Sequence, residues 1–86
     1  MEIEYSIQAK NDIDYWKKTN NSVILKKIRA LLESIQNTPF EGIGKPESLK
    51  HNMTGCWSRR ITQEHRIIYE VSENIIHILS IKGHYK

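Results

Sequence analysis

The chain has 86 residues, of which 38% are hydrophobic and 27% charged, and its formal net charge at pH 7 is +3. This length predicts a single domain over residues 1–86, and the composition excludes a disordered chain. The longest apolar runs, residues 23–25 and 78–79, are too short to span a bilayer, and the acidic N-terminus lacks the cationic region of a secretion signal. The single cysteine, Cys56, excludes an internal disulfide, and no Cys/His spacing matches a zinc site. We therefore expect a cytoplasmic protein that binds no membrane, metal or cofactor.

Two helices are predicted in the first half of the chain. Residues 1–5 alternate between apolar and polar side chains, which predicts a short strand before them. Ser6 is a suitable N-cap for a helix that continues to about Lys18. Its apolar face consists of Ile7, Ile13 and Trp16. A second helix is predicted over residues 22–37, and its apolar stripe consists of Ile24, Ile28, Leu31, Leu32 and Ile35. Because the break between the helices is short, they should pack as a hairpin.

Strand periodicity replaces helical periodicity in the second half. Residues 38–55 hold three of the four glycines and both prolines, which predicts an ordered loop. Strands are predicted over residues 56–62, 66–71 and 75–82, with a hairpin turn at 72–74. The last strand is apolar on both faces, so it should lie inside the sheet. The predicted fold is α+β, in the order β-α-α-β-β-β, with a helical hairpin packed on one face of a mainly antiparallel, twisted sheet.

Positive charge is concentrated between residues 45 and 66. This window holds five basic and two acidic residues, whereas the rest of the chain holds eight of each. Cations bind phosphates and aromatic rings stack on bases, so a basic window that includes Trp57 predicts an RNA-binding surface. The candidate RNA-binding residues are Lys45, Lys50, Arg59 and Arg60. The alternative is an ordinary solvated face of the sheet.

A set of residues suited to phosphodiester cleavage lies in this window and at the C-terminus. Glu47 can take a proton from an attacking hydroxyl, and His84 can give one to a leaving oxygen. An arginine such as Arg66 can hold the negative phosphate between them. The alternative for Glu47 is a solvated loop carboxylate, and for His84 a surface imidazole. Cys56 has no partner that would make it a nucleophile, so we interpret it as a small packing residue.

The orientation of the two candidate arginines is left open by the sequence. In the strand predicted over residues 56–62, Arg59 and Arg60 point to opposite faces. Arg66 lies on the same face as Arg60 only if the connection between the strands has an odd length or contains a bulge. Both arginines could instead form ion pairs, Arg60 with Glu70 and Arg66 with Glu64.

Five motifs follow one another along the chain. They are Thr38-Pro39-Phe40-Glu41-Gly42-Ile43-Gly44-Lys45-Pro46-Glu47, Leu49-Lys50-His51, Trp57-Ser58-Arg59-Arg60-Ile61, Glu64-His65-Arg66 and His84-Tyr85. Together they closely resemble the YoeB toxin family, a group of RelE-like toxins from bacterial type II toxin–antitoxin systems. The resemblance covers essentially the whole chain and implies a RelE-like fold.

The resemblance implies a ribosome-dependent mRNA endonuclease that cuts the codon in the vacant A site. The 2′-hydroxyl of the RNA would attack, leaving a cyclic 2′,3′-phosphate and a 5′-hydroxyl. In the pattern of the family, Glu47 matches the general base and His84 the general acid. Arg66 matches the arginine that stabilises the pentavalent phosphate, and Tyr85 matches the tyrosine that orients the substrate. Positions that contact RNA in the family match Lys50 and Arg60.

The implied partners are a YefM-like antitoxin, the A site of the 70S ribosome with its rRNA and mRNA, and a second copy of the chain in a homodimer. An acidic, partly disordered antitoxin would cover the basic face. Two other functions are left open. A ParE-like toxin of the same fold would bind DNA gyrase and would not need the acid–base set. A non-catalytic RNA- or ribosome-binding module would use the basic window alone.

Overall fold

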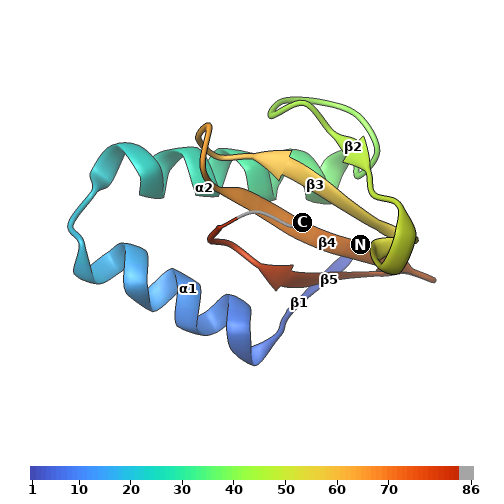
Figure 1. The fold of residues 1–86 in the computed structure, drawn as a ribbon, viewed down its shortest axis with the longest axis horizontal. Helices are drawn as coiled ribbons and strands as arrows, with labels where there is room; N and C mark the ends of the chain where they lie inside the picture. Colours follow the sequence, from blue (N-terminus) through green and yellow to red (C-terminus); the bar gives the residue numbers. More distant parts are fainter. Residues whose placement is uncertain (84–86) are drawn as a thin grey trace.

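The computed structural model describes residues 1–83, and its two helices have the bounds that the sequence predicts. α1 (Ile7–Lys18) begins after Ser6, whose Oγ accepts a hydrogen bond from the Ala9 amide and confirms the predicted N-cap. α2 (Ser22–Asn37) begins after Asn21, whose side chain accepts a hydrogen bond from the Ile24 amide. Figure 1 shows the helices joined by a short turn at one side of the molecule and running alongside the sheet.

Five strands form one mixed sheet in the order β1-β5-β4-β3-β2. Their bounds are β1 (Glu2–Tyr5), β2 (Glu47–Ser48), β3 (Cys56–Arg60), β4 (Arg66–Ser72) and β5 (Ile75–Ser80). β1 runs parallel to β5, and the other neighbours are antiparallel. The predicted α+β fold is therefore confirmed, with the predicted helices and strands in their predicted order and one additional strand, β2. β5 is an interior strand, as its apolar faces indicated.

Two details of the prediction are wrong. The predicted loop over residues 38–55 contains the short strand β2 and the 3-10 helix η1 (His51–Met53), because β2 gains its hydrogen bonds only by pairing with β3. Ile7 was assigned to the apolar face of the first helix but is 79% exposed. The buried face of α1 consists of Ala9, Asp12 and Trp16, whose three- and four-residue spacing leaves Ile7 outside it.

The core lies between the helices and one face of the sheet. It joins residues of α1 and α2 to alternate residues of β4 and β5, namely Ala9, Trp16, Ile28, Leu31, Ile35, Ile67, Tyr69, Ile76 and Ile78. Successive strand residues point to opposite faces, so Arg66 and Ile68 lie on the other side of the sheet from Ile67. We call that other side the open face, since neither helix packs against it. A second small cluster of Leu49, Cys56 and Ile68 lies there.

Candidate functional site

Arg60 and Arg66 lie directly opposite each other at one end of the open face. Arg60 is the last residue of β3 and Arg66 the first of β4, and the two are Cα partners in the antiparallel ladder. The connection between the strands has five residues, an odd length, so both side chains leave the sheet on the same side. Like charges placed opposite each other destabilise a sheet pair. This position therefore suits a ligand whose negative charge both guanidiniums can bind.

The alternative ion pairs, Arg60 with Glu70 and Arg66 with Glu64, do not form. The ion pair between side chains within residues 1–83 is instead that of His77 Nδ1 with Glu4 Oε1, at 3.4 Å and near the other edge of the sheet. The Nε atom of Arg60 and the Oγ of Ser58 are buried and have no hydrogen-bond partner in the described part of the chain. Buried polar atoms are nearly always paired in proteins, so these two unsatisfied atoms are exceptions within residues 1–83.

Glu47 is brought to the same face by β2. It lies opposite Ser58 in the β2–β3 ladder, and Ser58 shares its face with Arg60 two residues further on. A carboxylate at the edge of the sheet thus stands next to the paired arginines. Sequence reasoning did not select Ser58, although its alternation with Arg60 along β3 was a usable signal.

The prediction that Arg59 binds RNA is wrong, because its side chain is fully buried on the helix side of the sheet. Its Nε donates to Tyr69 Oη at 3.0 Å, and Nη1 donates to Ser34 Oγ at 2.9 Å and to Ile43 O at 2.8 Å. Nη2 donates to Thr38 O at 2.7 Å and to Glu41 O at 2.8 Å. A guanidinium has five N–H donors. All five are used inside the protein, so none is left for a phosphate.

These five bonds, which we call the Arg59 clamp, fix the loop that leads to Glu47. Three of them end on main-chain carbonyls of residues 38–43, and Tyr69 Oη adds a further bond to Pro39 O at 2.6 Å. The next residue, Arg60, donates its amide to Gly44 O at 2.6 Å. Gly42 and Gly44 lie so close to this cluster that a Cβ at either would collide with Ser34 or Leu31. The loop that carries Glu47 is therefore attached to both helix and sheet.

The remaining predicted site residues are in two groups. Lys45 and Lys50 are exposed on either side of Glu47, so both ammonium groups can reach a ligand there. His84 and Tyr85 lie outside the described residues. The described chain ends at Gly83, whose carbonyl accepts a hydrogen bond from the Arg66 amide at 2.8 Å. The described part of the chain therefore ends beside Arg66, one of the paired arginines.

The electrostatics of Cys56 agree with a packing role. Burial raises the pKa of its thiol, and the neighbouring Glu70 carboxylate raises it further. A thiol of this kind stays protonated and is a weak nucleophile near neutral pH. No group of three or more His, Cys, Asp or Glu side chains within residues 1–83 is placed to hold a metal ion. No helix in that part of the chain is long and apolar enough to cross a membrane.

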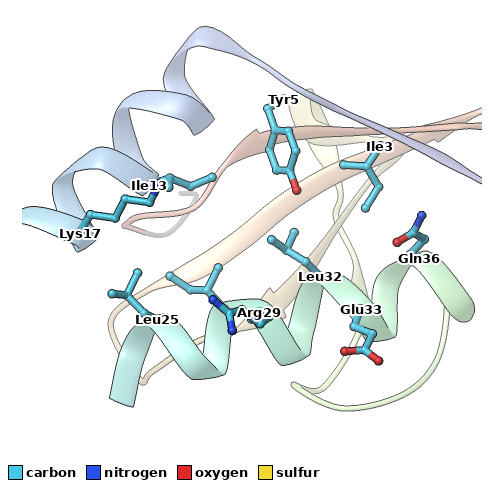
Figure 2. Close-up of a pocket in the computed structure, with 10 residues that line it drawn as sticks. Ile3, Tyr5, Ile13, Lys17, Leu25, Arg29, Leu32, Glu33 and Gln36 are labelled. Carbon is cyan, nitrogen blue, oxygen red and sulfur yellow. The ribbon is translucent and has the colours of Figure 1, made fainter. Parts of the chain in front are cut away.

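A separate groove lies between β1 and the two helices (Figure 2). Figure 2 shows Tyr5 and Ile3 on one wall and Leu25 and Leu32 of α2 on the other. Lys17, Arg29 and Glu33 lie around the groove, which is thus mostly apolar with a charged rim. Because Ile3 and Tyr5 pack against the core beneath the helices, the groove is on the opposite side of the sheet from Arg60 and Arg66.

Comparison with known proteins gives a consistent result. A family model described as the YoeB-like toxin of bacterial type II toxin–antitoxin systems matches residues 5–85. The toxin YoeB of Escherichia coli K12 is 45% identical over 85 residues, which are 99% of this chain and 100% of that protein. A solved YoeB/ParE toxin from Agrobacterium tumefaciens has a TM-score of 0.93 and 38% identity, covering 99% of this chain and 100% of the other.

YoeB of Staphylococcus aureus has been solved both with YefM and as a dimer. In the complex it has a TM-score of 0.86 and 50% identity to this chain, and in the dimer 0.87 and 49%. Both alignments cover 99% of this chain and 98% of the other.

Proposed function

Because the chain belongs to the YoeB-like toxins of bacterial type II toxin–antitoxin systems, we propose that it is a ribosome-dependent mRNA endoribonuclease. Its substrate would be the mRNA codon in the A site of the 70S ribosome. The observation that carries the proposal is the pairing of Arg60 with Arg66 on the face that also holds Glu47. Two guanidiniums with no carboxylate partner in residues 1–83 suit a phosphodiester, and a carboxylate beside them suits proton transfer.

In this proposal the RNA supplies its own nucleophile and no metal takes part. Glu47 removes the proton of a 2′-hydroxyl, whose oxygen forms a bond to the adjacent phosphorus. Arg66 stabilises the charge of the pentavalent phosphate. The bond to the 5′-oxygen breaks, and His84 gives that oxygen a proton, which yields a cyclic 2′,3′-phosphate and a 5′-hydroxyl. Tyr85 would orient the substrate.

RNA contact in this proposal comes from three exposed or part-exposed cations. Lys45 and Lys50 flank Glu47 and would bind neighbouring phosphates, and Arg60 would bind the strand through a guanidinium whose Nε has no partner in residues 1–83. Arg59 has no part in this contact, since the Arg59 clamp uses all its donors.

The partners we propose follow the S. aureus relatives. A YefM-like antitoxin would silence the protein, and its acidic segment would cover the basic window from Lys45 to Arg66. The S. aureus YoeB dimer supports the further proposal that this chain forms a homodimer. The cytoplasm, where ribosomes translate, would be the place of action.

Primer extension on a defined mRNA with programmed 70S ribosomes tests the proposal. Wild type should give discrete cuts in the A-site codon, and none without ribosomes. Glu47→Gln and His84→Gln should each reduce the cleavage rate by about 10²–10⁴-fold, the usual contribution of a general base or acid. Glu33→Gln, the same change at an exposed site on α2, is the matched control and should cut like wild type.

The same samples separate the proposal from the two other functions. Inhibition of gyrase supercoiling by a wild type that leaves mRNA intact would favour a ParE-like toxin. Ribosome binding with no cleavage, and equal growth inhibition by wild type and Glu47→Gln in cells, would favour a non-catalytic binding module. Either result would overturn the proposal that the chain is an endoribonuclease.

A further inference from the structure

The segment that follows β5 is held along its backbone by side chains of α1. Asp12 is buried, and its Oδ2 accepts the Ile81 amide at 2.8 Å. Trp16 Nε1 donates to the Ile81 carbonyl at 2.9 Å in a buried hydrogen bond. Both polar groups of Ile81 are thus bound by one helix. This double contact fixes the chain two residues before its last described position.

Gly83 is fixed in the same way by His65 and Arg66. Its amide donates to His65 Nδ1 at 2.9 Å, and its carbonyl accepts the Arg66 amide at 2.8 Å. Gly83 has φ of 75°, in the left-handed region that glycine adopts without strain. Gly83 therefore takes a left-handed conformation, and its amide and carbonyl are held by His65 and by Arg66, one of the paired arginines.

The His65 ring is itself held in place. It lies edge-on to Trp16, with ring centroids 4.9 Å apart and planes at 86°. Its main-chain amide donates to Thr62 Oγ1 at 3.1 Å, and its carbonyl accepts the amides of Ile61 and Thr62. A main-chain amide can only donate, so Nδ1 must be the acceptor and the ring carries its proton on Nε2.

We propose that His65 is a positioning residue of the active site, which sets the direction of the chain at the step from Gly83 to His84. The proposal rests on the proposed function, which gives His84 the role of general acid. His65 need not touch RNA to act. His65 would hold the backbone at Gly83, the residue before the proposed general acid His84. Loss of the His65 side chain would therefore leave RNA binding intact and lower the rate of the chemical step.

Two substitutions at one position test this role. His65→Leu keeps an apolar side chain of similar reach beside Trp16 but removes the acceptor. His65→Asn keeps an acceptor oxygen near the place of Nδ1. We expect His65→Leu to reduce kcat for A-site cleavage by about 10–100-fold, with KM for the programmed ribosome changed less than about threefold. His65→Asn should recover most of the lost kcat. His77→Leu, which removes an imidazole that does not contact Gly83, is the matched control.

A readout without RNA measures the contact directly. The Gly83 amide should exchange with solvent at least about tenfold faster in His65→Leu than in wild type, and its ¹H–¹⁵N signal should move. In His65→Asn and His77→Leu its exchange should stay near wild type. Unchanged protection in a folded His65→Leu protein would overturn the proposal. So would wild-type kcat in that variant, or a loss that His65→Asn does not restore. A wild type that cuts no mRNA would instead overturn the proposed function, before any His65 variant is compared.

Discussion

The Arg59 clamp predicts that Arg59→Met strongly destabilises the protein. Five hydrogen bonds of 2.7–3.0 Å end on this guanidinium, and the side chain is fully buried. Hydrogen bonds to a charged group contribute about 1.5–3 kcal/mol each, so a simple sum would reach about 8–15 kcal/mol. That sum is as large as the whole stability of a small domain, because it neglects the cost of removing the guanidinium from water.

The expected net loss is smaller and can be bounded. Methionine retains most of the apolar stem, so packing changes little. The acceptors that lose their donor are the hydroxyls of Ser34 and Tyr69 and three loop carbonyls, and part of this set can be rehydrated because the loop over residues 38–43 is largely exposed. Leaving a buried acceptor without its donor costs about 1–3 kcal/mol, so one or two acceptors that stay away from water would cost about 1–6 kcal/mol. We expect a loss in that range.

Urea unfolding followed by tryptophan fluorescence measures this loss. The matched control is Arg29→Met, the same change at an exposed position on α2, which should stay within about 0.5 kcal/mol of wild type. Arg59→Lys, which keeps the charge but not the planar fork, should also be destabilised. If Arg59→Met unfolds at the same urea concentration as Arg29→Met, the clamp contributes no stability and our reasoning is refuted.

Two further predictions concern stability. Leu31 is fully buried in the core, so Leu31→Ala should reduce the free energy of unfolding by about 2–5 kcal/mol, and a neutral result in urea would contradict the core assignment. Burial raises the pKa of Cys56, Tyr5 and Tyr69 above their ordinary values of 9.0, 10.0 and 10.0. The unfolded chain then loses these protons first, so the stability contributed by these three groups is fully present below about pH 9 and is lost as the pH rises through the raised values. Cys56→Ala should delay the start of that loss to about pH 10, and an identical profile in this variant would exclude the thiol as a cause.

Local signals made the helices predictable from the sequence. The stripe of α2 and the N-cap at Ser6 act within a few residues, so no knowledge of the tertiary structure was needed to place either helix. β2 lacks any such signal, since it is a two-residue strand of exposed polar residues. It exists because its backbone pairs with β3, and that pairing depends on how the loop over residues 38–46 folds back.

Arg59 shows why the charge of a residue did not reveal its role. Alternation along β3 placed Arg59 on the face opposite Arg60, yet its charge suggested contact with RNA. A buried arginine needs an acceptor for each donor, and here they come from residues 34–43 and Tyr69, which are distant in sequence. Sequence spacing does not encode such a set. The relation of Arg60 to Arg66 was open for a similar reason, since only the five-residue connection in the folded chain aligns them.

The two arginines of one dipeptide therefore support the same candidate site in different ways. Arg60 belongs to the open face, where it stands opposite Arg66. Arg59 lies on the other side of the sheet and fixes the loop that brings Glu47 to that face.

The segment that follows β5 is supported in an equivalent way, because Asp12, Trp16 and His65 bind the backbone of residues 81–83. The sheet supplies Arg60 and Arg66 directly, whereas Glu47 lies on the two-residue edge strand β2 and residues 81–83 follow the end of β5. Buried polar contacts close to the site are what a small domain can use to hold such segments, since its core is too small to cover them. Substitutions at Arg59 and His65 should thus reduce activity by different routes, the first mainly through folding and loop geometry and the second through the rate of the chemical step.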